Sequence, residues 1–102
     1  MRAVGLMVHG GPEVLEVVDV EAVTAGPGQI RIQNFAAAVN PTDIVARDGT
    51  RAKLQSQFPP PYVPGMDAAG IVDQVGEGVS TGIKLGDRVM AMVVPKASHG
   101  AY

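Results

Sequence analysis

The chain has 102 residues, which is enough for one domain with a single hydrophobic core. Its eight basic and ten acidic residues give a formal charge of −2 without a basic run, so we expect no nucleic-acid partner. The lack of cysteine excludes disulfides and thiol chemistry, and no apolar run approaches the roughly 18 residues that a membrane-spanning helix needs. Without a signal-like pattern at the N-terminus, the expected location is cytoplasmic.

The first third of the chain predicts strands that are separated by turns rich in glycine and proline. Runs of β-branched or alternating apolar residues favour strands at residues 2–8, 14–20 and 29–33. The turns between them lie at residues 9–12 and 25–28. In the third strand polar and apolar residues alternate, which predicts that Ile30 and Ile32 face the core.

A short helix is expected at residues 40–48. Asn40 is a favourable N-cap, Pro41 suits the first helical position, and the carboxylate of Asp43 can reach back to the cap. Gly49 is a typical residue for ending such a helix.

The neighbourhood of this helix leaves one question open. A helix of this length is not stable alone in water, so we expect it to be held by packing through Ile44 and Val45. The small residues at 36–39, just before it, interrupt the alternation of the preceding strand. That interruption fits either a β-bulge or a strand buried on both faces.

The second half of the chain combines a loop with two further strands. Residues 50–57 are polar, and residues 58–62 contain three consecutive prolines, which predicts a surface loop. Apolar runs favour strands at residues 67–75 and 88–94, with turns at residues 76–78 and 85–87. Five or six strands and one helix predict a mainly β fold, a small β-barrel.

One glycine-rich stretch imitates a nucleotide-binding motif. Gly76, Glu77 and Gly78 follow a predicted strand, as a dinucleotide-binding fingerprint would. The third glycine, Gly82, comes one residue late, and no helical pattern follows it. We therefore interpret this stretch as tight turns.

Five motifs occur in order along the chain. They are HGGPEVL at residues 9–15, VNPTD at 39–43, PGMDAAGIV at 64–72, VGEGV at 75–79 and GDRV at 86–89. Together they resemble the N-terminal part of the catalytic domain of the medium-chain dehydrogenase/reductase superfamily, and most closely its zinc-independent quinone oxidoreductase branch. The resemblance covers essentially the whole chain and implies a GroES-like, partly open β-barrel.

The same resemblance implies a site without metal. The zinc-dependent alcohol dehydrogenases of this superfamily have a cysteine where this chain has Asn40, a histidine where it has Met66, and a glutamate near Asp67. Neither an amide nor a thioether is a good zinc ligand. The cysteines of the family's structural zinc lobe are also missing.

The activity implied by the resemblance is hydride transfer from NADPH to a quinone, a carbonyl or a conjugated alkene. Asn40 would contact the cofactor, and Thr42 would be the catalytic residue, donating from its hydroxyl to a developing oxyanion. The implied substrate pocket contains Asn40, Thr42, Val45, Arg51 and Met66. Some quinone reductases carry tyrosines at the positions of Val45 and Arg51, so the small-molecule acceptor stays open.

Several of these residues also have a purely structural interpretation. The alternatives are a helix cap for Asn40, a first-turn residue for Thr42, a structural carboxylate for Asp43 and an apolar filler for Met66. His9 and His99 lack a paired acid or nucleophile in the sequence, so we expect no catalytic role for either.

Proteins of this family continue beyond the length of this chain with further barrel strands and a dinucleotide-binding domain. We therefore expect residues 1–102 to form the acceptor-side domain, truncated at its C-terminal end, with weak or no NADPH binding of its own. Exposed strand edges would then favour a homo-oligomer. The alternative is a non-enzymatic GroES-like module that binds a partner or self-assembles.

Overall fold

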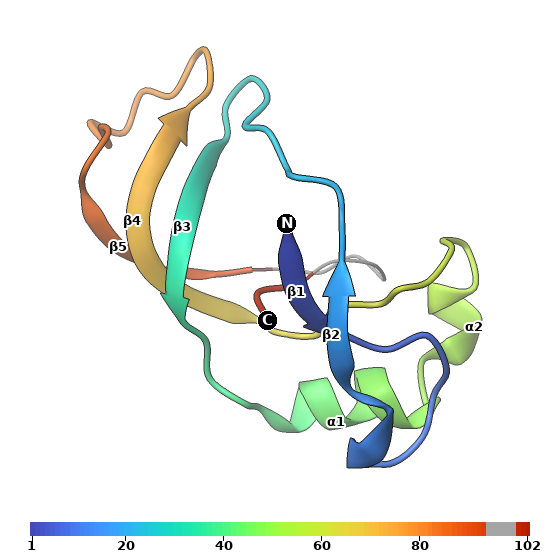
Figure 1. Ribbon diagram of the computed structural model, residues 1–102. Helices are drawn as coiled ribbons and strands as arrows, with labels where there is room; N and C mark the ends of the chain where they lie inside the picture. Colours follow the sequence, from blue (N-terminus) through green and yellow to red (C-terminus); the bar gives the residue numbers. More distant parts are fainter. Residues whose placement is uncertain (94–99) are drawn as a thin grey trace.

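The computed structural model describes residues 1–93 and 100–102, which form two antiparallel sheets and two short α-helices (Figure 1). The strands are β1 (Arg2–Gly5), β2 (Glu16–Asp19), β3 (Ile30–Ala36), β4 (Asp67–Val75) and β5 (Arg88–Met92). The helices are α1 (Pro41–Asp48), α2 (Ala52–Gln55) and the 3-10 helix η1 (Pro12–Val14). Within the described ranges no helix is both long and apolar enough to span a bilayer.

The larger sheet has the strand order β3-β4-β5 and curves along one side of the molecule (Figure 1). Its register shifts between Asn34 and Ala36, which leaves Phe35 unpaired and 68% exposed. Of the two interpretations of the interrupted alternation, the structure therefore shows the bulge. A second shift between Arg31 and Ile32 leaves Ile30 and Ile32 only half-buried, so the predicted inward face is not a simple alternating one.

The smaller sheet pairs β1 with β2 and joins the rest of the fold through one isolated bridge. Leu6 and Tyr62 exchange two backbone hydrogen bonds of 2.9 Å. Leu6 is fully buried at this junction. The remaining buried apolar residues, Val18, Tyr62, Val63, Ala68 and Val72, come from the prolyl loop and both sheets. The two sheets do not close into a barrel, so the predicted mainly β, partly open architecture is confirmed.

The expectation of one helix is wrong, because α2 lies inside the stretch predicted to be a polar loop. This single turn is stabilised by tertiary contacts of Gln55, which is 5% exposed. Its Nε2 donates to the carbonyl of Ala46 at 3.0 Å, and its Oε1 lies 2.6 Å from Nε2 of His9. A four-residue helix has no apolar periodicity, so polar composition alone suggested a loop.

Strand boundaries differ from the predicted ones mainly at the N-terminal sheet. The first strand ends at Gly5 because Leu6 leaves it to pair with Tyr62, and η1 delays the second strand to Glu16. Asp67–Val75 has the predicted bounds. The last strand ends at Met92, and the predicted end of that strand, residue 94, lies outside the described residues.

The glycine-rich stretch after β4 is a turn, as interpreted from the sequence. Gly76 donates its N–H to the carbonyl of Gln29 at 2.8 Å, so two chain segments approach closely there. A Cβ on Gly76 would lie 1.9 Å from the carbonyl oxygen of Gly26, whereas Gly78 faces open space and has φ 77°. The two glycines are thus needed for different reasons: close approach at one and backbone conformation at the other.

These two glycines make a matched pair of substitutions. Gly76→Ala must push β4 away from the turn before β3, so it should lower the free energy of unfolding by about 3 kcal/mol. Gly78→Ala meets no atom and should lower it by about 1 kcal/mol, the cost of the left-handed conformation. Urea unfolding of both variants checks the difference, and equal losses would contradict the close approach.

Candidate functional site

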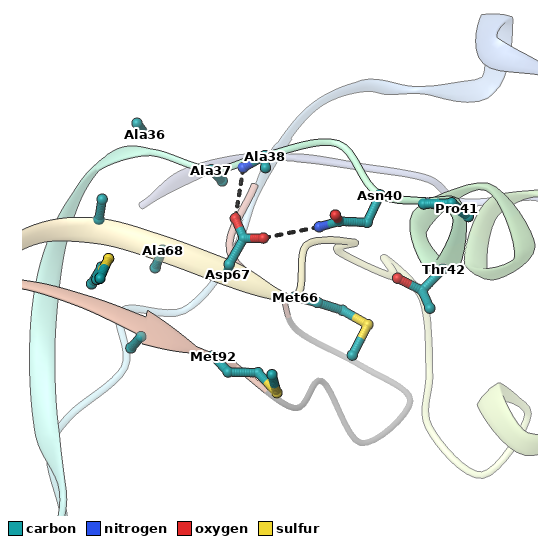
Figure 2. Close-up of a pocket in the computed structure, with 13 residues that line it drawn as sticks. Ala36, Ala37, Ala38, Asn40, Pro41, Thr42, Met66, Asp67, Ala68 and Met92 are labelled. Carbon is teal, nitrogen blue, oxygen red and sulfur yellow. Dashed lines mark hydrogen bonds between the residues drawn. The ribbon is translucent and has the colours of Figure 1, made fainter.

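A wide groove of about 1020 Å³ opens where the end of β3, the start of α1 and the β4–β5 pair meet (Figure 2). Most of its lining is small or flexible and apolar. The lining residues are Ala36, Ala37, Ala38, Asn40, Pro41, Thr42, Met66, Asp67, Ala68, Ala69, Met90, Ala91 and Met92. Six alanines and three methionines leave only a few polar groups, and a mostly apolar lining with a few polar groups is usual for a small-molecule site.

Helix α1 brings two predicted site residues to this groove. It begins after the N-cap Asn40 with Pro41 in the first turn, and it ends at Gly49, which has φ 98°. The predicted helix at residues 40–48 is confirmed. Ile44, however, is 47% exposed, so the expectation that it helps to pack the helix is wrong; its partner in that prediction, Val45, is half-buried.

The helix is held instead through the buried carboxylate of Asp43, which is 5% exposed. Its Oδ2 accepts from the Asn40 N–H at 2.8 Å and from the Tyr102 hydroxyl at 2.9 Å. Its Oδ1 accepts from the Gly65 N–H at 2.9 Å. One side chain thereby joins the start of α1 to the segment that leads into β4. These contacts agree with the structural role that the sequence predicts for Asp43.

Asp67 makes a second set of contacts to the chain that enters α1. Its Oδ1 accepts from the Ala38 N–H at 2.7 Å, and its Oδ2 accepts from Nδ2 of Asn40 at 2.9 Å (Figure 2). The hydrogen bond from Ala38, and after it the one from Asn40, lowers the pKa of Asp67 below its ordinary value. The Asp67 side chain is therefore a carboxylate that only accepts hydrogen bonds at neutral pH.

Thr42 contributes the polar group of the groove that most needs a partner. Its Oγ1 is buried, and among the residues that the structure describes it has no hydrogen-bond partner. In Figure 2 this oxygen points toward the space between Asn40 and Met66. A buried hydroxyl without a partner costs roughly 1–3 kcal/mol, so a ligand that accepts from it would remove that cost.

The structure brings together three of the five residues predicted for the substrate pocket: Asn40, Thr42 and Met66. Val45 and Arg51 are not in its lining. Val45 lies a turn further along α1, and Arg51 is exposed at the start of α2, after the left-handed turn at Gly49 redirects the chain. Their assignment to the substrate pocket stays a prediction.

Sequence reasoning missed the methionines of β5 and the contacts of Asp67. Met90 and Met92 alternate with Ala91, a period of two that places both methionines on one face of the strand, where they are 89% and 81% exposed. That alternation was visible in the sequence. Asp67 lies 27 positions from Asn40 and 29 positions from Ala38 in the sequence, so no local sequence pattern predicts these contacts.

His9 lies outside the groove, in a structural environment. Its ring stacks on Tyr62 with centroids 5.5 Å apart, and its Nε2 contacts Gln55. His99 lies outside the described residues. In the described parts of the chain no three His, Cys, Asp or Glu side chains are grouped as metal ligands would be.

Comparisons with known proteins decide the family. Residues 26–102 match the family model of the alcohol dehydrogenase GroES-like domain. The chain belongs to this family. The GroES-like fold implied by the sequence motifs is thus confirmed.

Two quinone oxidoreductases illustrate the similarity along the whole chain. The chain is 42% identical to the quinone oxidoreductase of Rattus norvegicus over 103 residues, covering 100% of this chain and 30% of that protein. The quinone oxidoreductase of Coxiella burnetii superposes with a TM-score of 0.86 at 30% identity, covering 97% of this chain and 31% of that one.

A third relative was solved with a cofactor. The quinone oxidoreductase of Escherichia coli complexed with NADPH superposes with a TM-score of 0.74 at 35% identity, covering 91% of this chain and 27% of that one. The resemblance to quinone oxidoreductases is confirmed. The chain spans about 30% of the length of the curated relatives it matches.

The contact between Asp43 and Tyr102 predicts an alkaline transition. Burial, and after it the hydrogen bond to Asp43, raises the pKa of Tyr102 from 10.0 to about 12. Because the folded pKa lies above the unfolded one, this contribution to stability is fully present below pH 10.0 and is lost as the pH rises through about 12.

Tyrosinate absorbance, measured beside circular dichroism, checks this transition. The wild-type chain should show one tyrosine that ionises near pH 12, and Tyr102→Phe should remove that step. Ionisation of Tyr102 near pH 10.0 while the wild-type chain stays folded would contradict the contact.

Proposed function

We propose that this domain provides the acceptor side of a zinc-independent, NADPH-dependent oxidoreductase that reduces a quinone, a carbonyl or a conjugated alkene. The observation that carries the proposal is the buried Thr42 hydroxyl, which lies in the same apolar groove as Asn40 and has no partner within residues 1–93 and 100–102. The similarity to quinone oxidoreductases supports the reaction class.

The residues of the groove fit a flat cofactor ring and a flat acceptor. Alanine side chains on β3, β4 and β5 leave room for an aromatic ring to approach the backbone, and the methionines can adapt to its outline. Oγ1 of Thr42, which no described residue bonds, fits a carbonyl oxygen because a hydroxyl can donate to it.

When bound, NADPH supplies the hydride in this class of reaction. The contribution of the chain is placement and charge stabilisation. Thr42 donates its hydroxyl proton as a hydrogen bond to the acceptor oxygen, where negative charge develops, and one such donor is worth about 10²-fold in rate. Asn40 contacts the cofactor at the edge of the groove, and the apolar walls exclude water from the reacting atoms.

The donor chemistry at the groove supports a reaction without zinc. Asn40 and Met66 offer an amide and a thioether, and the amide nitrogen of Asn40 is already bound to Asp67. Zinc prefers thiolate, imidazole or carboxylate ligands. We therefore assign the polarisation of the acceptor to Thr42.

The main cofactor site belongs to a dinucleotide-binding domain that residues 1–102 do not contain. We expect the 102-residue chain to bind NADPH negligibly. Micromolar affinity in a fluorescence titration would contradict the assignment of the main cofactor site to the dinucleotide-binding domain.

The edge strand β5 supports self-association of the domain, because among the described strands it pairs only with β4.

A binding module without catalysis is the second candidate. The exposed Met90 and Met92 on β5 favour it, since a large apolar surface suits a protein partner or another copy of the chain. NADPH oxidation discriminates the two candidates, because the module would bind its protein partner without oxidising NADPH.

The reaction is tested in the complete reading frame that encodes these residues. NADPH oxidation with menadione should be observed, and Thr42→Val should lower kcat about 10²-fold because the donor to the acceptor oxygen is lost. Thr42→Ser should keep most of the rate. Thr50→Val, which changes an exposed threonine outside the groove, is the matched control. An unchanged kcat in Thr42→Val would contradict the role of Thr42, and absence of NADPH oxidation would favour the module.

A further inference from the structure

We propose that Asp67 is a positioning residue: it orients the side-chain amide of Asn40 so that an N–H faces the groove, which selects a ligand carbonyl oxygen at that place. The orientation itself depends only on contacts within the chain. The identity of the ligand group rests on the proposed function.

The contacts of Asp67 hold the chain on both sides of the helix start. One carboxylate oxygen accepts from the Ala38 N–H and the other from the Asn40 side chain. The start of β4 is therefore hydrogen-bonded to two residues of the segment that leads into α1. Both ion pairs found in the described residues lie elsewhere: the N-terminus pairs with Asp19, and Arg31 pairs with Asp73. Neutral N–H groups therefore balance the charge of Asp67.

The charge of Asp67 decides which way the amide of Asn40 faces. A carboxylate has no proton to donate, so only the amide nitrogen can face it, at 2.9 Å. Asn40 is also the N-cap of α1, where its main-chain carbonyl accepts from the Asp43 N–H at 2.9 Å and its main-chain N–H donates to Oδ2 of Asp43 at 2.8 Å. Because one N–H of the amide binds Asp67, its second N–H remains as a donor on a residue that lines the groove.

An N–H at this position discriminates between ligand groups. It can donate to the carbonyl oxygen of an acceptor or to the carboxamide oxygen of the cofactor, and it disfavours a ligand N–H group, which can only donate. Without Asp67 the side-chain amide of Asn40 could rotate so that its oxygen and nitrogen exchange places, and the oxygen would then face the groove. Asp67 would therefore act on the ligand through Asn40.

The orientation is tested by NMR of the asparagine side-chain amides. The chain has two asparagines, so the amide of Asn34 serves as an internal control for that of Asn40. In the wild-type chain the Asn40 amide signals should shift with a midpoint below pH 3.8, as Asp67 is protonated. The Asn34 amide, which binds the Ala101 carbonyl, should not follow. An Asn40 amide that does not titrate in the folded wild-type chain would overturn the proposal without any variant.

Substitutions test the same point independently. Asp67→Asn should abolish the titration of the Asn40 amide, and Asp67→Glu should restore part of it. Asp73→Asn is the matched control, because this carboxylate lies on the same strand and pairs with Arg31 at the surface. If Asp73→Asn abolished the Asn40 titration and Asp67→Asn did not, the assignment would be overturned.

The ligand part is tested with small probes on the folded chain. Acetophenone stands in for a carbonyl acceptor and nicotinamide for the carboxamide of the cofactor. At millimolar concentration at least one of them should shift the Asn40 amide signals, and the probe that gives the larger shift identifies the ligand that supplies the oxygen. α-Methylstyrene, which has the shape of acetophenone without its oxygen, should not shift them. Equal shifts with α-methylstyrene, or none with either carbonyl probe, would overturn the selection of a carbonyl while leaving the orientation standing. The NADPH oxidation assay reports separately on the proposed function.

Discussion

The hydrogen bonds that converge on the Asp43 carboxylate are the constraint on which the rest of the groove depends. A buried charge is costly unless it is fully bonded, and here N–H and O–H donors from separate segments satisfy it. Because these donors belong to Asn40, Gly65 and Tyr102, the start of α1 cannot move away from the segment that leads into β4 without exposing the charge. The groove between them is therefore preformed.

Asp67 reinforces the same junction from the other side. It binds Ala38 and Asn40, so the short connection between β3 and α1 is attached to β4 by a carboxylate as well. Two carboxylates thus place the polar groups of an otherwise apolar groove. In the proposed reaction, placement of this kind does the work that a metal would do in the zinc-dependent relatives, since Thr42 and Asn40 are positioned before any ligand arrives.

Local chemistry explains which parts of this architecture could be predicted from the sequence. The N-cap at Asn40, the stop at Gly49 and the bounds Asp67–Val75 follow from neighbouring residues alone, and the structure has them as predicted. The helix α2 could not be predicted in this way, because Gln55 stabilises it through contacts with Ala46 and His9.

The candidate site shows the same division. Asn40, Thr42 and Met66 were found through motifs, whereas the bond between Asp43 and Tyr102 joins residues 59 positions apart and leaves no trace in sequence spacing. Val45 and Arg51 were assigned to the pocket by position in a family pattern. Neither residue lines the groove, because helix phase and the turn at Gly49 decide where those side chains go.

The most direct measurement of the central role of Asp43 is urea unfolding of Asp43→Asn beside Asp48→Asn, an exposed carboxylate of the same helix. Asp43→Asn replaces an acceptor with a donor among buried donors and should lower the free energy of unfolding by about 3 kcal/mol. Asp48→Asn should lower it much less, because this carboxylate is exposed to solvent. Equal, small losses for the two variants would contradict the claim that one buried carboxylate holds the groove together.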